Sequence, residues 1–362
     1  MIISDKIVLT EMTAGSSWAL LSYGKGALFM YKEYISALTL EEQIQKIIEK
    51  NIIISNKEEV KWALKNHSYY SLINGYKRHF LADGETDKMI DGTNFNDFLK
   101  VYYLDNDLTE VIFKYILYVE KSLRARLAYE IAMQIGDSET IYLDRKHYKD
   151  TRKTRGYILN DIEKTIRNCR DESVTKYFKD NKQNIPPWII VQDLSFSTII
   201  GWLDILPYEI QNNIREDFFE HSHLYSKYQS AFFYNSLNFL REFRNKIAHG
   251  KIHFEEKTRH YLHVKSGIHF FNNTFYTDDT ISNNPTGKDL YAAIALICGL
   301  TLDRNVAQRF STDLFSTFSK YINTENGEVI ATINGKSIYQ IFNLPIDILE
   351  RMTVYYKSIS DF

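Results

Sequence analysis

Residues 109–134 contain neither glycine nor proline, and their apolar side chains recur at helical spacing. The residues that share one face are Ile112, Ile116, Val119, Leu123, Leu127 and Ile131. Because positions three and four apart lie on the same side of an α-helix, this pattern predicts a helix of about seven turns with one buried face. Helix breakers are scarce throughout, with 15 glycines and 5 prolines in 362 residues. The sequence therefore predicts an all-α fold.

Helical patterns cover most of the remaining chain. The predicted helices are 40–50, 57–66, 68–80, 93–104, 109–134, 160–181, 197–206, 207–220, 228–249, 288–302 and 305–322. Thr93 is the expected N-cap of one helix, and Asp105-Asn106-Asp107 is expected to cap the helix that starts near Thr109. Residues 266–287 are expected to form an extended loop or hairpin connector. Asn334-Gly335 predicts a small β-hairpin within 329–340.

Composition and charge exclude several classes of protein. The net charge of −2 and a pI near 6.6 do not indicate a general nucleic-acid binder, so RNA binding would depend on local basic patches. Two distant cysteines make no disulfide framework, which favours a reducing compartment. The first 15 residues lack the pattern of a signal peptide, and the longest apolar run, 292–298, is too short to cross a bilayer. We expect a cytoplasmic protein without membrane contact, metal or cofactor, since metal-ligand patterns such as HExxH and CxxC are missing.

The motif with the clearest chemistry is Arg-Asn-Lys-Ile-Ala-His at residues 244–249, followed by Gly250. An imidazole can move protons near neutral pH, and a guanidinium can hold a phosphate through paired donors. Metal-free cleavage of an RNA phosphodiester needs these groups. Gly250 fits the position after a helix end, so His249 is expected in the last turn, where the helix dipole favours its protonated form. The spacing alone is weak, because Arg215 and His221 form a similar pair without the asparagine and the glycine.

Two alternatives stay open for this motif. The arginine could pair with a core carboxylate, and the histidine could merely cap the last helical carbonyls.

Short blocks in a fixed order carry a resemblance to a known family. They are LTLEEQI at 38–44, SYYSLINGY at 68–76, GT at 92–93 with Phe95, YLD at 103–105 with Leu108, VEKSLR at 119–124, PPW at 186–188, LSF at 194–196 and the motif at 244–249. Over residues 38–253 the chain resembles the Abi-D/Abi-F group of bacterial abortive-infection proteins, whose core is a HEPN-like helical domain. Residues 1–37 lie outside the resemblance.

The resemblance implies three parts and a role for each motif residue. The parts are an N-terminal helical segment (1–92), a HEPN-like bundle (93–255) and a C-terminal helical extension with the small hairpin (256–362). His249 would act as general acid or base, Arg244 would stabilise the charged phosphorane, and Asn245 would fix their geometry. Glu120 and Arg124 would support the site from a neighbouring helix, with Glu120 neutralising and orienting Arg244. An exposed helix-surface pair is the alternative for these two residues.

Basic side chains that could contact RNA phosphates lie in several places. We expect Lys77, Arg78 and Lys246 to do so, since Lys77 and Arg78 follow a run of tyrosines that could stack on bases. The tyrosines could equally pack the N-terminal helices. The densest basic stretch, 145–155, could contact RNA or be a solvated loop.

The resulting functional hypothesis is a metal-independent HEPN-type endoribonuclease in the cytoplasm of a bacterium. It would act as an abortive-infection or toxin effector, controlled by a small structured RNA antitoxin. A homodimer is expected because the chain has one convincing motif, while HEPN ribonucleases build one site from two copies. One alternative is an RNA-binding module without cleavage, and another is a structural interaction protein.

Overall fold

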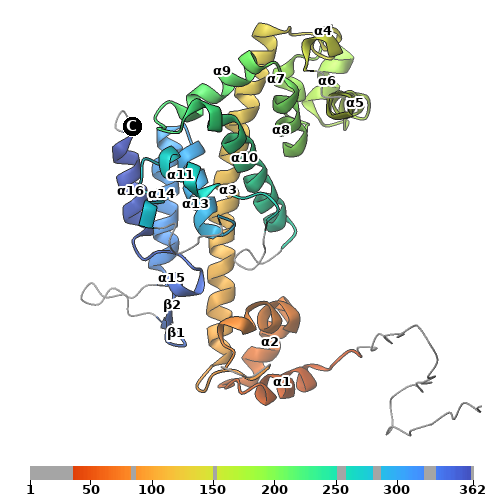
Figure 1. Cartoon of the computed structure of the whole chain (residues 1–362). Helices are drawn as coiled ribbons and strands as arrows, with labels where there is room; N and C mark the ends of the chain where they lie inside the picture. Colours follow the sequence, from red (N-terminus) through yellow and green to blue (C-terminus); the bar gives the residue numbers. More distant parts are fainter. Residues whose placement is uncertain are drawn as a thin grey trace, which may run out of the picture.

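The structure is a computed structural model that describes residues 36–82, 87–149, 153–250, 258–279, 287–321 and 332–359. Its longest described element is α3 (Phe95–Gln134), a helix of 40 residues along which the other helices pack (Figure 1). The six apolar residues of the predicted face are all buried in the core. The predicted helix and its buried face are confirmed.

Two predicted features near the start of α3 are wrong. Asn94, and not Thr93, caps the helix, because the Thr93 hydroxyl is hydrogen-bonded to other partners. The predicted break at residues 105–107 is also absent, and α3 continues through it. Asp105 is buried inside the helix, where it accepts a hydrogen bond of 3.0 Å from the Tyr76 hydroxyl. This tertiary partner makes the buried carboxylate tolerable in mid-helix.

The N-terminal segment surrounds the first turns of α3 (Figure 1). It contains α1 (Leu40–Glu49) and α2 (Lys57–His67), which confirm the two short predicted helices. Thr39 and Glu42 form a capping box that fixes the start of α1. The predicted helix at 68–80 includes a π-helical turn (Tyr70–Asn74) and a 3-10 turn (Lys77–His79), so it is helical but irregular.

A lobe of short helices packs at the other end of α3 (Figure 1). Its elements are α4 (Glu139–Tyr142), a 3-10 turn (Arg145–His147), α5 (Lys153–Arg167), α6 (Val174–Asn181), α7 (Pro187–Ile190) and α8 (Phe196–Ile205). The single helix predicted at 160–181 is wrong, because α5 and α6 are separate. Ser173 caps α6 by accepting from the Lys176 backbone N–H, and so starts a new helix there.

The motif lies at the end of a long helix beside the centre of α3. After α9 (Tyr208–Phe219), α10 (Ser226–Ala248) packs against α3, α8 and α13. Both helices agree with the predicted ones to within one or two residues. The buried side of α10 includes Leu237, Leu240, Phe243 and Ile247. The packing therefore fixes which side of α10 faces α3.

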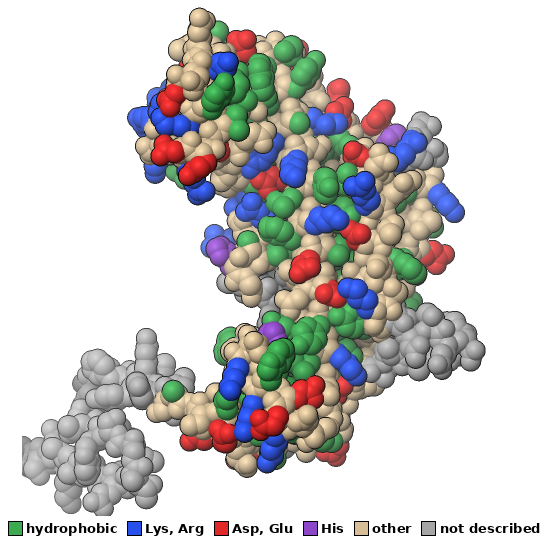
Figure 2. Space-filling view, turned by 180° about the vertical axis from the view of Figure 1, so that it is seen from behind, with side chains coloured by type: hydrophobic (Ala, Val, Ile, Leu, Met, Phe, Trp, Pro, Cys, Tyr) green, Lys and Arg blue, Asp and Glu red, His purple; other side chains and the backbone are tan. Residues whose placement is uncertain are grey.

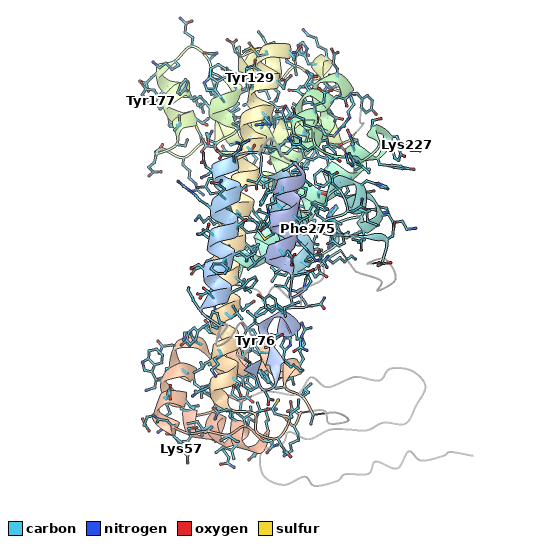
Figure 3. All side chains as sticks on the ribbon, turned by 90° about the vertical axis from the view of Figure 1, so that its left-hand side faces the viewer. Lys57, Tyr76, Tyr129, Tyr177, Lys227 and Phe275 are labelled. Atoms are coloured by element: carbon cyan, nitrogen blue, oxygen red, sulfur yellow. The ribbon has the colours of Figure 1, made fainter. Side chains whose placement is uncertain are left out.

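The C-terminal extension packs along α3 from the opposite side. Its helices are α11 (Val264–Phe270), α13 (Leu290–Leu300), α14 (Arg304–Ser319), α15 (Ile338–Ile341) and α16 (Ile348–Ser358). Every residue of α13 is buried, and α14 runs beside α3 (Figure 3). The connector predicted at 266–287 is wrong at its start, where residues 266–270 belong to α11; residues 280–286 lie outside the described part of the chain.

The predicted hairpin is confirmed where the structure describes it. Strands β1 (Thr332–Ile333) and β2 (Lys336–Ser337) pair antiparallel around Asn334 and Gly335, both of which have positive φ. Asn334 donates to the Thr93 hydroxyl (2.8 Å), and Lys336 donates to the His79 carbonyl (2.8 Å). The hairpin therefore joins the C-terminal extension to the N-terminal segment, near Tyr76 in Figure 3.

The all-α prediction is confirmed, because β1 and β2 are the only strands in the described residues. The HEPN-like character of the bundle stays a prediction.

Candidate functional site

A buried carboxylate lies where α3 meets α10. Glu120, in the middle of α3, is only 4% exposed. Its Oε1 accepts hydrogen bonds from Nε (3.2 Å) and Nη2 of Arg124, one turn along the helix. Its Oε2 lies 3.6 Å from Nη2 of Arg244 on α10. A buried carboxylate is unfavourable unless it is paired, and here two arginines from two helices share it.

Arg124 also holds the connection between α7 and α8. Its Nη1 donates to the Val191 carbonyl and its Nη2 donates to the Leu194 carbonyl (2.8 Å). Carbonyls that follow a helix end lack intrahelical partners, so a buried guanidinium can satisfy them. Arg124 therefore links the block at 119–124 to the block at 194–196 and to the end of α7.

Arg244 is placed between the core and the surface. Its side chain is 30% exposed, and its Nη1 donates to the Asn245 side-chain oxygen (2.9 Å). Its Nε is buried without a hydrogen-bond partner among the described residues. Glu120 thus neutralises a guanidinium that is still partly accessible, while the unused Nε donor is buried. Such a group can accept an anionic ligand without leaving its carboxylate.

His249 lies at the end of the motif helix, as the sequence predicts. It is the C-cap of α10 and is exposed, and Gly250 follows with a φ of +64°. Its position is i+5 relative to Arg244. This spacing corresponds to about 7.5 Å along the helix axis and a rotation of about 140° around it. Asn245 is one turn before His249 and so lies nearer its face. The structure brings Arg244 and Asn245 together, with His249 at the helix end beyond them.

The surrounding surface is concave. Figure 2 shows the molecule hollowed on one side, between the lobe of α4–α8 and the N-terminal segment. Figure 1 shows α10 on this side of α3. Lysine and arginine side chains are interspersed with acidic ones on the face in Figure 2, in agreement with the near-neutral net charge.

The basic residues predicted to contact RNA are divided between two places. Lys246 is part of the motif helix, whereas Lys77 and Arg78 lie on the 3-10 turn of the N-terminal segment. The neighbouring Tyr76 contacts Asp105, which is fifteen residues before Glu120 along α3. That separation is about 22 Å along the helix axis. The structure therefore does not bring Lys77 and Arg78 to the motif.

Sequence reasoning missed a second imidazole beside the motif helix. His260 Nδ1 lies 2.7 Å from Oε1 of Glu242, and the backbone N–H groups of Arg259 and His260 donate to Oε2 (2.7 and 3.4 Å). Burial alone would raise the pKa of the Glu242 carboxyl, but the hydrogen bonds from His260 and the two backbone groups lower it. Glu242 is seven residues before His249, hence on nearly the same helix face. No local sequence pattern indicated that His260 would contact Glu242, because eighteen residues separate their positions in the chain.

Arg215 and His221, which have a spacing similar to that of the motif, lie in a different environment. Arg215 donates to Asn212 on its own helix (2.7 Å), and His221 lies 3.9 Å from Glu220. Neither is described in contact with α3 carboxylates. Among the described residues there is also no group of three or more His, Cys, Asp or Glu that could hold a metal ion, and no helix long and apolar enough to cross a membrane.

Comparison with known proteins identifies the family. Residues 62–255 match the family of Abi-like proteins, which is more than half of the chain and includes Glu120, Arg124 and the complete motif. No curated protein and no solved structure matches the chain. The family name refers to abortive infection, a bacterial response. This agrees with the resemblance seen in the sequence blocks. The chain therefore belongs to the Abi-like protein family.

Proposed function

We propose that this protein is a metal-independent endoribonuclease of the HEPN type that acts as an effector in abortive infection. The observation that carries the proposal is the pairing of Arg244 with the buried Glu120, which leaves part of the guanidinium accessible on the helix that ends at the exposed His249. An arginine held in this way is preorganised for a phosphate. The neighbouring imidazole can exchange protons without moving the helix.

The proposed reaction uses the ribose 2′-hydroxyl as nucleophile. An imidazole takes the 2′-hydroxyl proton while the 2′-oxygen forms a bond to phosphorus. The bond between phosphorus and the 5′-oxygen breaks, and a protonated imidazole donates a proton to that oxygen. Arg244 stabilises the negative charge of the pentacoordinate phosphorane, and Asn245 holds the guanidinium in position. The products are a 2′,3′-cyclic phosphate and a 5′-hydroxyl.

One chain has one motif histidine, while this reaction uses a base and an acid. A homodimer with facing α10 helices would supply both, since a twofold axis through the site places each His249 opposite its copy. The two Glu120 carboxylates would offset the repulsion between two nearby arginines. We further propose that a small structured RNA controls the enzyme.

The test is to incubate the purified protein with total cellular RNA in EDTA and to map the new ends. We expect cleavage to persist in EDTA and to leave 2′,3′-cyclic phosphate or 3′-phosphate ends. His249→Ala and Arg244→Ala should remove the activity. His221→Ala is the matched control, because it removes the partly exposed histidine of the similar Arg215 pair, in the turn that follows α9. Ends with a 3′-hydroxyl, strict dependence on Mg²⁺, or equal loss in the His221 variant would contradict the proposal.

A specific observation also favours a second candidate, an RNA-binding module that does not cleave. The Arg244 and His249 positions are about 140° apart around α10, so one chain alone does not direct both at the same phosphate. The same groups could then hold an RNA backbone without acting on it. Turnover distinguishes the two candidates: a binding module retains intact RNA, and an endoribonuclease releases new ends.

A further inference from the structure

A pocket of about 540 Å³ opens in the N-terminal segment, well away from the motif helix. Lys46 and Glu49 of α1 and its C-cap Lys50 line the pocket together with Lys77, Asp87 and Lys88. Residues far apart in the sequence therefore bring four ammonium groups around one cavity. Only Lys77 among these lysines was expected to contact RNA. Lys46, Glu49 and Lys50 precede the residues that match the family model, whereas Lys77, Asp87 and Lys88 lie within them.

The positive charges in this pocket exceed the negative ones. Asp87 pairs with both Lys50 and Lys77 (3.0 Å to the latter), and Lys88 donates to the Glu49 carbonyl (2.6 Å). The four lysines exceed the two carboxylates, Glu49 and Asp87, by two charges. Asp87 offsets part of the repulsion among these lysines, and the remaining positive surplus favours a further anion in the pocket.

Lys50 is the lysine most affected by this repulsion between positive charges. Its side chain is only 14% exposed. Burial lowers the pKa of its ammonium group, and the nearby charges of Lys77, Lys46 and Lys88 lower it further. A partly buried ammonium group that faces three others is a preformed point of attraction for an anion with more than one charge.

We propose that this pocket binds a ligand with two or more adjacent phosphate groups, supplied either by an RNA strand or by a free nucleotide. Converging ammonium groups bind phosphate oxygens through charge-assisted hydrogen bonds. The half-buried ring of Tyr69 and the exposed amide of Asn74 also line the cavity and suit the nucleoside part. The RNA source rests on the proposed function, whereas the phosphate site does not.

The competing explanation for these lysines is purely structural: their ion pairs and hydrogen bonds would hold residues 87–88 against the end of α1. Asp87 distinguishes the two explanations, since its carboxylate lies where a phosphate would compete for Lys50 and Lys77. In a phosphate site, Asp87→Asn removes a competing anion and tightens phosphate binding. In a fastening network, the same change lowers stability and leaves phosphate binding unaltered.

The experiment measures binding of inorganic pyrophosphate, ATP and a single-stranded RNA of about twelve nucleotides by the full-length protein. The pocket variant is Lys46→Gln with Lys50→Gln. The matched control is Lys57→Gln with Lys100→Gln, which removes the same charge from exposed positions on α2 and α3. Lys46→Gln with Lys88→Gln serves if the Lys50 change prevents folding, as judged by circular dichroism.

We expect the pocket variant to lose at least about tenfold in pyrophosphate affinity, with the control near wild type. If RNA is the source, the slope of log affinity against log salt also becomes shallower by about 1.4, at about 0.7 per phosphate contact. If a free nucleotide is the source, ATP binding falls tenfold and RNA binding does not.

Equal behaviour of the pocket and control variants toward all three probes would overturn the proposal, and so would unaltered binding in Asp87→Asn. His249→Ala separates this inference from the proposed function. We expect that variant to bind pyrophosphate like wild type, whether or not the protein cleaves RNA. Loss of pyrophosphate binding in His249→Ala would place the phosphate site at the motif helix and would also overturn the inference.

Discussion

Replacing Glu120 by glutamine should destabilise the fold by about 3 kcal/mol. The larger part comes from Arg124, whose side chain is 13% exposed and would keep its charge beside a neutral amide. Removing one partner of a buried ion pair costs about 3–5 kcal/mol, and the low end applies because Arg124 retains the carbonyls of Val191 and Leu194. The contact with Arg244 adds less than about 1 kcal/mol, since that arginine is 30% exposed and lies 3.6 Å away.

The measurement is urea-induced unfolding, with a comparison of midpoints at constant slope. Glu110→Gln is the control, because Glu110 is an exposed glutamate on the same helix and its change should stay within about 0.5 kcal/mol. A double-mutant cycle with Arg124→Met should give a larger coupling energy than one with Arg244→Met. If Glu120→Gln is no more destabilising than Glu110→Gln, or if the order of the two couplings is reversed, the assignment of Glu120 as the shared partner is refuted.

Three further outcomes are expected. Burial, with smaller effects from Arg78 and Lys336, lowers the pKa of His79 to about 4, so between about pH 6.5 and pH 4 the unfolded chain binds more protons than the folded one. The free energy of unfolding should therefore decrease by up to about 3 kcal/mol as the pH is lowered through that window. A pH–stability curve of His79→Gln that keeps the full slope would count against this. Gly201→Ala should cost about 1–3 kcal/mol in thermal or urea unfolding, because its new Cβ would clash with the Ile158 side chain of α5; failure of Ile158→Ala to relieve that cost in the double variant would contradict the packing explanation. Light scattering should give about twice the 42.6 kDa chain mass with RNA bound, and a strictly monomeric particle with full cleavage activity would exclude the facing α10 arrangement.

The sequence predicted those elements whose stabilising contacts are local or periodic. The buried face of α3 follows from the spacing of its apolar residues, and the hairpin follows from Asn334-Gly335 because both residues must adopt positive φ. The predictions failed where a distant residue supplies the decisive contact. The sequence around Asp105 predicts a helix cap, but in the structure Asp105 lies inside α3 and accepts a buried hydrogen bond from Tyr76. The Thr93 hydroxyl accepts a hydrogen bond from Asn334, which is distant in the sequence.

The candidate site divides in the same way. Arg244, Asn245 and His249 are adjacent in sequence, so their positions on one helix were predictable from spacing. The proximity of Glu120 to Arg244 came from the resemblance, and the geometry of the α3–α10 contact agrees with it. No local pattern indicated that His260 would return to Glu242, or that Lys46 and Lys50 would face Lys77 and Lys88. Such contacts depend on how helices are arranged in space, which periodicity does not encode.

The hairpin contacts also impose an order of events during synthesis. Thr93 and His79 are among the first third of the residues to be made, yet their partners Asn334 and Lys336 belong to the last tenth. A growing chain on the ribosome can form α1, α2 and the start of α3 early, as N-terminal units generally do. It cannot form these two hydrogen bonds until almost the whole polypeptide has emerged. A truncated product that stops before residue 334 would carry the complete Arg244–His249 motif but lack the fastening between its two ends.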